Sequence, residues 1–172
     1  YPPNHSIETA PLKVISDLLR AADYGRLPLL VLLDLSAAFD TVDHTTLIDV
    51  LHRSFAVDGQ PLTWFKSYLS DRTQTFSTAG KQSTPLNVEC SVPQGSVLGP
   101  LEFISYTENI REIFDSFKIT HHLFTDDKQL LKSSEIKDIN SVQLLLSSCI
   151  SVVRDWCSSR RAAVYKKKKK KL

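Results

Sequence analysis

Apolar residues along the chain form short, nearly continuous runs that predict strands. Leu29–Leu35 is such a run and predicts a central strand buried on both faces of a sheet. Ile119–Phe124 and Gln129–Lys132 predict two more strands, joined by Thr125–Lys128. A polar hairpin at the periphery is predicted from Thr73–Ala79 and Pro85–Glu89, joined around Gly80–Lys81.

Elsewhere apolar residues recur three and four positions apart, which predicts helices. The expected helices run from a cap at Thr9 or Ser6 to about Asp23, from Asp43 to Phe55, over Pro61–Leu69, over Leu101–Phe117 and over about Ile136–Trp156. The expected apolar faces are Leu12, Ile15, Leu19 and Ala22 in the first helix and Trp64, Phe65 and Tyr68 in the third. Helices that cover a small antiparallel sheet make the expected fold class α+β.

Composition limits the class of protein. A chain of 172 residues with 42% hydrophobic residues can bury one core. No unbroken apolar stretch approaches the roughly 18 residues of a membrane span, so no membrane partner is expected. The three cysteines show no CxxC pair, which argues for reduced thiols and an intracellular location, nucleus or cytoplasm, and against structural zinc.

Charge is distributed unevenly along the chain. Six of the 21 basic residues are Lys166–Lys171, so the remainder has 15 basic against 19 acidic residues, a balance of −4. This body lacks the basic footprint of a complete nucleic-acid-binding domain. We expect residues 158–172 to form a disordered basic tail with nonspecific affinity for RNA. The lysine run can equally be read as translated poly(A).

Carboxylates follow two of the apolar runs. Asp34 lies at the end of the first, and Asp126–Asp127 at the end of another. Taken alone, each fits a turn or a cap at the end of a strand. Together, acids at the ends of neighbouring strands predict a shared site for two divalent cations, the usual means of nucleotidyl transfer.

Other polar and aromatic residues admit two interpretations each. Phe39 fits core packing or a contact with a ligand. Gln94–Gly95, in a loop framed by Pro and Gly, fits turn chemistry or hydrogen bonding to a sugar or base edge. We interpret His121–His122 as alternation along a strand rather than as metal ligands.

Three segments in order resemble the reverse transcriptase of non-long-terminal-repeat (LINE-type) retrotransposons. LLVLLDLSAAFDTVDH is similar to that family's motif A, SVPQGSVLGP to motif B, and FTDD to motif C. The flanking NHSIETAPLKVISDLL, WFKSYLSDRTQ and DDKQL are also similar. The resemblance covers residues 1–157 and implies a polymerase palm with part of the fingers connection.

The resemblance also implies roles. Asp34, Asp126 and Asp127 become catalytic ligands of two Mg²⁺ or Mn²⁺ ions. Phe39 becomes the steric gate under the sugar, and Gln94 and Gly95 contact the incoming dNTP. The implied partners are an RNA template and a DNA primer, and the implied activity is RNA-directed DNA synthesis (nucleotidyl transfer).

The chain departs from the family pattern in several places. Lys128 follows the acids where the family usually has Thr, and Glu102 replaces an apolar residue after motif B. The start of the fingers and the thumb are missing from the pattern. We therefore expect a truncated retroelement fragment, weakly active or inactive in isolation. The alternative is a non-catalytic remnant that binds RNA or a partner, and an unrelated metal-dependent nuclease is a third possibility.

Overall fold

Two compact units make up the computed structural model of this chain. The described residues are 9–36, 39–93, 95–124, 127–160 and 163–166. The first unit comprises Tyr1–Ser36, Ile110–Cys157 and Ala163–Leu172, and the second comprises Ala37–Asn109 and Ser158–Ala162.

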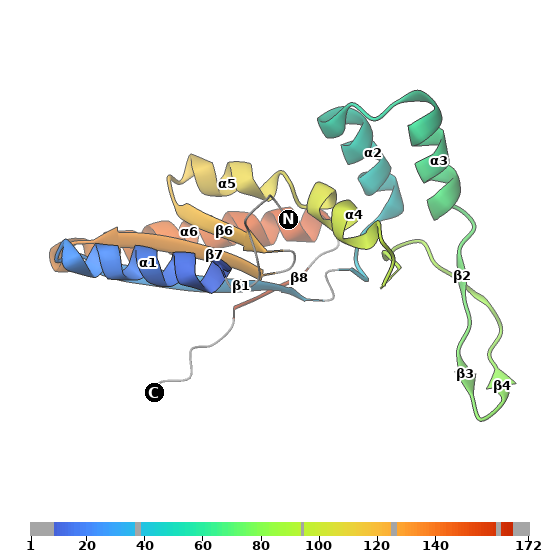
Figure 1. Cartoon of the computed structure of the whole chain (residues 1–172), viewed down its shortest axis with the longest axis horizontal. Coiled ribbons are helices and arrows are strands. Elements are labelled where there is room, and N and C mark those ends of the chain that lie inside the picture. Colours follow the sequence, from blue (N-terminus) through green and yellow to red (C-terminus); the bar gives the residue numbers. More distant parts are fainter. Residues whose placement is uncertain (1–8, 37–38, 94, 125–126, 161–162, 167–172) are drawn as a thin grey trace. The chain divides into compact units, whose positions relative to one another are not determined.

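Helices and strands are mixed along the chain, as expected (Figure 1). The helices are α1 (Thr9–Asp23), α2 (His44–Phe55), α3 (Gly59–Leu69), α4 (Gly99–Tyr106), α5 (Ile110–Ser116), the 3₁₀ turn η1 (Ile136–Asp138) and α6 (Ile139–Ser159). The strands are β1 (Leu27–Ser36), β2 (Thr73–Gln74), β3 (Ser77–Thr78), β4 (Lys81–Gln82), β5 (Leu86–Asn87), β6 (Thr120–Phe124), β7 (Asp127–Ser134) and β8 (Ala163–Lys166). The α+β prediction is confirmed.

The first unit is built on a four-stranded antiparallel sheet in the order β6-β7-β1-β8. Residues directly opposite each other in neighbouring strands share a face of the sheet. One face therefore carries Asp34, Asp127 and His122, and the other carries Leu33 and Lys128. Helix α1 contacts the first face through His122, whereas α5 contacts the second through Phe114.

Helix α6 contributes buried residues to the core of this unit. Its buried residues are Leu146, Cys149, Val153 and Cys157. By length and composition alone, Ile136–Ser159 could cross a membrane, contrary to the expectation that no stretch would be long enough. One such helix is weak evidence for a membrane span, because core helices of soluble proteins pass the same test; 22% of this stretch is buried.

The second unit consists of α2, α3 and α4 with a polar hairpin. Asp43 caps α2, as predicted, because its carboxylate accepts the Thr46 N–H at 2.8 Å. The hairpin is two short ladders, β2 with β5 and β3 with β4. Its tip is the two-residue turn Ala79–Gly80, both in the left-handed region that twisted hairpins favour.

Several predicted helix features were wrong. The helix predicted over Leu101–Phe117 is two helices, because Thr107 ends α4 by donating its backbone N–H and its hydroxyl to the Phe103 carbonyl. Helix α3 buries Leu62 and Leu69, whereas Trp64, expected on the packing side, is exposed and stacks on Tyr68.

The predicted face of α1 and the predicted tail also differ from the structure. Helix α1 buries Val14 and Ala21, while Leu12, Ile15 and Leu19 are exposed. The helix has two apolar stripes, and periodicity does not choose between them. Within the segment expected to be disordered, α6 continues to Ser159 and Ala163–Lys166 pairs with β1 as β8. Valine and tyrosine in β8 favour such an edge strand.

Candidate active site

Two of the three predicted acids lie directly opposite each other. Asp34 near the end of β1 is the register partner of Asp127, the first residue of β7. Cross-strand neighbours of this kind have Cβ atoms about 4.5–5.5 Å apart. The third acid, Asp126, lies outside the described residues, as does Gln94. The antiparallel ladder thus brings together carboxylates that are 93 positions apart in the sequence.

The chemistry of this pair suits a hard cation. Two carboxylates directly opposite in a ladder repel each other, and a shared cation relieves that repulsion. Carboxylate oxygens are also the ligands that Mg²⁺ and Mn²⁺ prefer. Among the described residues, no three His, Cys, Asp or Glu side chains gather as a metal site. Asp34 and Asp127 therefore fit as part of a metal site, and the described residues supply no third ligand of this type.

Phe39 belongs to the second unit. Its ring centroid lies 5.0 Å from that of Phe103 on α4, with the two rings tilted by 34°. Its carbonyl accepts the backbone N–H of Val92 at 2.8 Å. Phe39 therefore contacts Val92 in motif B and Phe103 in the helix that follows it. The residue is half-buried. This position is compatible with packing and with a ligand contact.

The motif B loop is a tight turn that leads into α4. The Ser96 N–H donates to the Pro93 carbonyl at 3.1 Å, and the Ser96 hydroxyl accepts the Gly99 N–H at 2.9 Å. Gly95 is exposed with φ of 82°, a conformation that glycine adopts without strain. A Cβ on Gly99 would approach the Ser96 hydroxyl to 3.0 Å, so Ser96 can pack this closely against residue 99 because that residue has no side chain.

Lys128, the departure that follows the acids, does not share their face. Its register partner is Leu33, on the opposite face of the sheet from Asp34. Lys128 is only 3% exposed, and its charge acts on the Cys157 thiol of α6. Burial nevertheless dominates and raises the pKa of Cys157 to about 11. Strand alternation thus places the buried Lys128 on the face of the sheet opposite to Asp34 and Asp127.

Glu102, the other departure, is buried in the second unit. It is 2% exposed, and neither carboxylate oxygen has a hydrogen-bond partner among the described residues. Burial raises the pKa of Glu102, and the nearby charges of Arg72 and His44 oppose that effect. An apolar residue at this position would avoid the cost of an unsatisfied buried group.

Gln129 was not singled out by the sequence, although it lies beside the acids. It is two residues after Asp127 on the same strand and therefore shares its face. Its neighbours in register are Leu32 on β1 and His122 on β6. Its side-chain oxygen Oε1 is buried, with no hydrogen-bond partner among the residues that the structure describes. Period-two counting from Asp127 would have found it.

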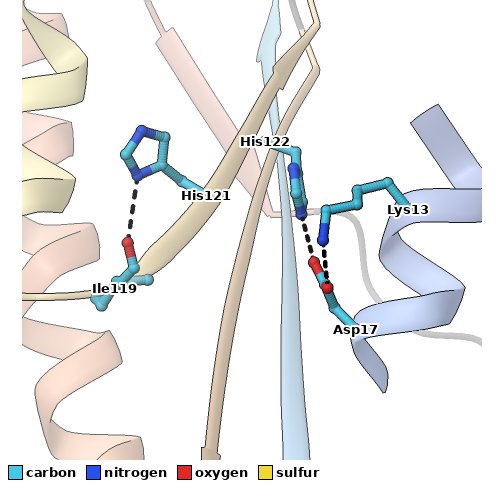
Figure 2. A network of polar contacts seen from close by, with 5 residues as sticks. All are labelled: Lys13, Asp17, Ile119, His121 and His122. Carbon is cyan, nitrogen blue, oxygen red and sulfur yellow. Dashed lines mark hydrogen bonds and ion pairs between the residues drawn. The ribbon is translucent and has the colours of Figure 1, made fainter. Parts of the chain in front are cut away.

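Figure 2 shows that His121 and His122 point to opposite faces, as strand alternation predicts. His121 donates Nδ1–H to the Ile119 carbonyl at 3.2 Å. His122 donates Nε2–H to Asp17 on α1 at 3.2 Å, and Lys13 donates to the same carboxylate at 2.6 Å (Figure 2). Burial raises the pKa of Asp17, but these two hydrogen bonds outweigh it and leave the pKa lowered.

Comparison with known proteins places this arrangement in context. A family model described as "Reverse transcriptase (RNA-dependent DNA polymerase)" matches residues 1–172. A probable RNA-directed DNA polymerase from transposon BS of Drosophila melanogaster is 30% identical over 161 residues, covering 89% of this chain and 17% of the relative. The RNA-directed DNA polymerase from the mobile element jockey of the same species is 27% identical, covering 86% of this chain and 16% of the relative. This chain therefore spans less than a fifth of either relative.

Solved structures share the fold. The truncated apo telomerase of Candida tropicalis superposes with a TM-score of 0.59 at 16% identity, covering 98% of this chain and 36% of that one. The telomerase of Candida albicans, solved with a fragment of telomeric RNA, gives a TM-score of 0.59 at 17% identity and covers 93% of this chain and 30% of that one. At such identities the likeness concerns the fold alone, and it agrees with the palm-like architecture expected from the sequence.

Proposed function

The chain belongs to the reverse transcriptase (RNA-dependent DNA polymerase) family, which confirms the resemblance to retrotransposon enzymes, and we propose that it carries the acid-bearing core of an RNA-directed DNA polymerase. The observation that carries the proposal is the pairing of Asp34 with Asp127 across β1 and β7. These two residues come from motifs A and C. Their convergence at strand ends is what nucleotidyl transfer by two cations requires.

Asp34, Asp126 and Asp127 are the proposed ligands of two divalent cations, Mg²⁺ or Mn²⁺. When bound, the cations supply Lewis-acid activation of the primer 3′-hydroxyl and neutralise charge on the phosphates of the dNTP. The protein's own part is to fix the carboxylates, which the β1–β7 ladder does through backbone hydrogen bonds. A rigid pair of ligands reduces the reorganisation required when the cations bind.

Further roles are proposed for residues of the second unit. Phe39 stacks under the sugar of the incoming nucleotide and excludes a 2′-hydroxyl, and its contact with Phe103 supports the ring from one side. Gln94 and Gly95 contact the nucleotide through the motif B loop. An RNA template and a DNA primer are the proposed partners.

The test uses metal binding and primer extension on the full 172-residue chain. We expect weak Mn²⁺ binding by paramagnetic relaxation, and Asp34→Asn or Asp127→Asn should weaken it about tenfold because each removes one of few oxygen ligands. Any primer extension should be slow and should vanish in Asp126→Asn. Phe39→Val should raise ribonucleotide incorporation relative to deoxyribonucleotide incorporation.

Asp49→Asn is the matched control, because Asp49 lies on α2 and pairs with Arg53. It should leave Mn²⁺ affinity unchanged. If Asp34→Asn and Asp49→Asn bind Mn²⁺ equally, the acid pair holds no cation and the proposal fails. Metal binding without any primer extension would instead favour the non-catalytic remnant.

A further inference from the structure

A basic hollow lies between α1 and the sheet of the first unit. It has a volume of about 400 Å³, and the charged residues that line it are Lys13, Asp17, Arg20, Arg26 and Lys132. Its residues on β7 are Leu131, Lys132 and Ser133, four to six positions along the strand from Asp127. At about 3.3 Å per residue, that is roughly 13–20 Å from the acid pair.

The charges of this hollow do not cancel. Its acid, Asp17, already accepts hydrogen bonds from Lys13 at 2.6 Å and His122 at 3.2 Å. The Lys132 ammonium group donates to the Lys118 carbonyl at 2.6 Å, on the face away from Asp17. Among the described residues that line the hollow, Arg20 and Arg26 are therefore the cations available to a ligand. Asp23, close by on the last turn of α1, is exposed and reduces this positive charge without removing it.

Arg26 is held in place. Its guanidinium group donates one N–H to the Ser133 carbonyl of β7 at 3.2 Å, while Arg26 as a whole remains exposed. Guanidinium has five N–H donors in a fixed plane, so this bond orients it and leaves its fork geometry suited to phosphate.

An exposed aromatic ring stands beside these cations. Tyr24 is 77% exposed, yet its turn is well ordered by backbone bonds from Gly25 to Ala22 at 2.8 Å and from Arg26 to Ala21 at 3.0 Å. Gly25 adopts φ of 65°, which ends the helix and turns the chain into β1. The exposure of Tyr24 is thus imposed by a formed turn.

The same turn also lines a second hollow, of about 690 Å³. Its lining includes Tyr24 and Arg26 again, together with the exposed Ile136 and the ion pair of Glu135 with Lys137 at 2.8 Å. Tyr24 and Arg26 therefore line both hollows, and the second hollow is also lined by an apolar side chain, Ile136.

We propose that the α1–β1 turn is a second contact site for a single-stranded nucleic acid, with Arg20 and Arg26 on phosphates and Tyr24 stacked on a base. A positive groove with an aromatic ring is the combination that binds single strands. A free phosphate has no base that could stack on the Tyr24 ring, and neither has an acidic peptide. The choice of nucleic acid as ligand rests on the proposed function, whereas the location does not.

The test measures binding of a fluorescent, unstructured RNA of about 20 nucleotides by anisotropy, in EDTA. The full chain with Lys167–Lys171→Ser is the reference, so that the tail does not mask the site. The double variant Arg20→Ala/Arg26→Ala should weaken binding about tenfold and lower the slope of log affinity against log salt by about 1.4, or 0.7 per phosphate. Tyr24→Ala should weaken binding about fivefold or more with the slope unchanged, and Tyr24→Phe should bind like the reference.

Arg53→Ala/Arg111→Ala is the matched control, since both arginines are exposed and neither lines either hollow. If it weakens binding as much as the double variant at Arg20 and Arg26, the binding is diffuse and the proposal fails. Equal competition by polyglutamate and by RNA, or full affinity in Tyr24→Ala, would also overturn it. Because the RNA measurement is made in EDTA, it does not depend on bound cations, so a failure of the metal site appears only in the Mn²⁺ measurement.

Discussion

Glu102 shows how one substitution can set the stability of a unit. Glu102→Leu restores an apolar residue and removes two buried oxygens that have no hydrogen-bond partner in the described structure. We expect it to increase the free energy of unfolding at pH 7 by about 1–3 kcal/mol, the usual cost of an unsatisfied buried polar group. Urea denaturation of the two chains measures the difference. Glu112→Leu, at an exposed position of α5, should change it by less than about 0.5 kcal/mol.

The same residue predicts a dependence on pH. Burial raises the folded pKa of Glu102 above its usual value of 4.5, so the folded chain holds this proton more tightly than the unfolded chain does. The resulting stabilisation is complete below pH 4.5 and is lost as the pH rises through the folded pKa. The advantage of Glu102→Leu should therefore grow with pH over that range. An advantage that is constant from pH 4 to pH 8 would contradict the raised pKa.

At the scale of elements, α1 is attached to the sheet by a titratable contact. This contact is the hydrogen bond from His122 on β6 to the Asp17 carboxylate of α1. Burial raises the pKa of Asp17, but the hydrogen bonds from Lys13 and His122 outweigh that effect and leave the pKa lowered. A lowered folded pKa gives stabilisation that is present above the usual value of 3.8 and is lost as the pH falls through the folded pKa. Asp17→Asn should therefore lower the melting temperature at pH 6 and flatten its decline between pH 5 and pH 2.

Asp49→Asn is a suitable comparison, because Asp49 also pairs with a cation four residues away on its helix but is half exposed. It should leave the acid limb of the melting curve unchanged. Hydrogen exchange gives a second measurement, since loss of the Asp17 contact should speed exchange in α1 more than in α2. Equal exchange in α1 for the native chain and Asp17→Asn would show that apolar packing alone holds the helix.

The elements that the sequence predicted well are those specified by local signals. The apolar run of β1, the cap at Asp43 and the hairpin turn at Gly80 need no knowledge of distant residues, and the positions of all three were predicted correctly. The predicted burial of β1 on both faces was wrong, because Leu33 and Leu35 on one face are buried whereas Leu30 and Leu32 on the other are only partly buried. The burial of α1 and α3 was predicted wrongly because each helix has more than one apolar stripe. The choice depends on partners far away in sequence, such as His122, which is 105 residues from Asp17.

The same distinction holds for the candidate site. Strand-end positions and the motifs selected Asp34, Asp126 and Asp127, and the ladder places Asp34 and Asp127 opposite each other, while Asp126 lies outside the described residues. The face on which Lys128 lies follows from strand alternation, and counting from Asp127 would have placed it on the face opposite to Asp34 and Asp127. The pairing of Asp17 with His122 has no local signal, because a histidine on a strand gives no indication of which helix covers it.

At the scale of the whole molecule, charge is divided between a mildly acidic body and a lysine run. Without Lys166–Lys171 the balance is −4, from 15 basic and 19 acidic residues. The run should therefore dominate nonspecific binding to RNA at low salt. Replacing Lys167–Lys171 by Ser removes up to five phosphate contacts, which should lower the slope of log affinity against log salt by about 3.5.

Anisotropy over a range of salt concentrations measures this slope, and the double variant Arg20→Ala/Arg26→Ala in the native background is the comparison. With the tail intact, that variant should change the slope far less than the loss of the tail does, because two phosphate contacts are few beside five. The two effects should add, since the turn at Tyr24 and the lysine run are separate cationic groups. A slope that is unchanged by removal of the five lysines would place the main electrostatic contact on the folded body, despite its net negative charge.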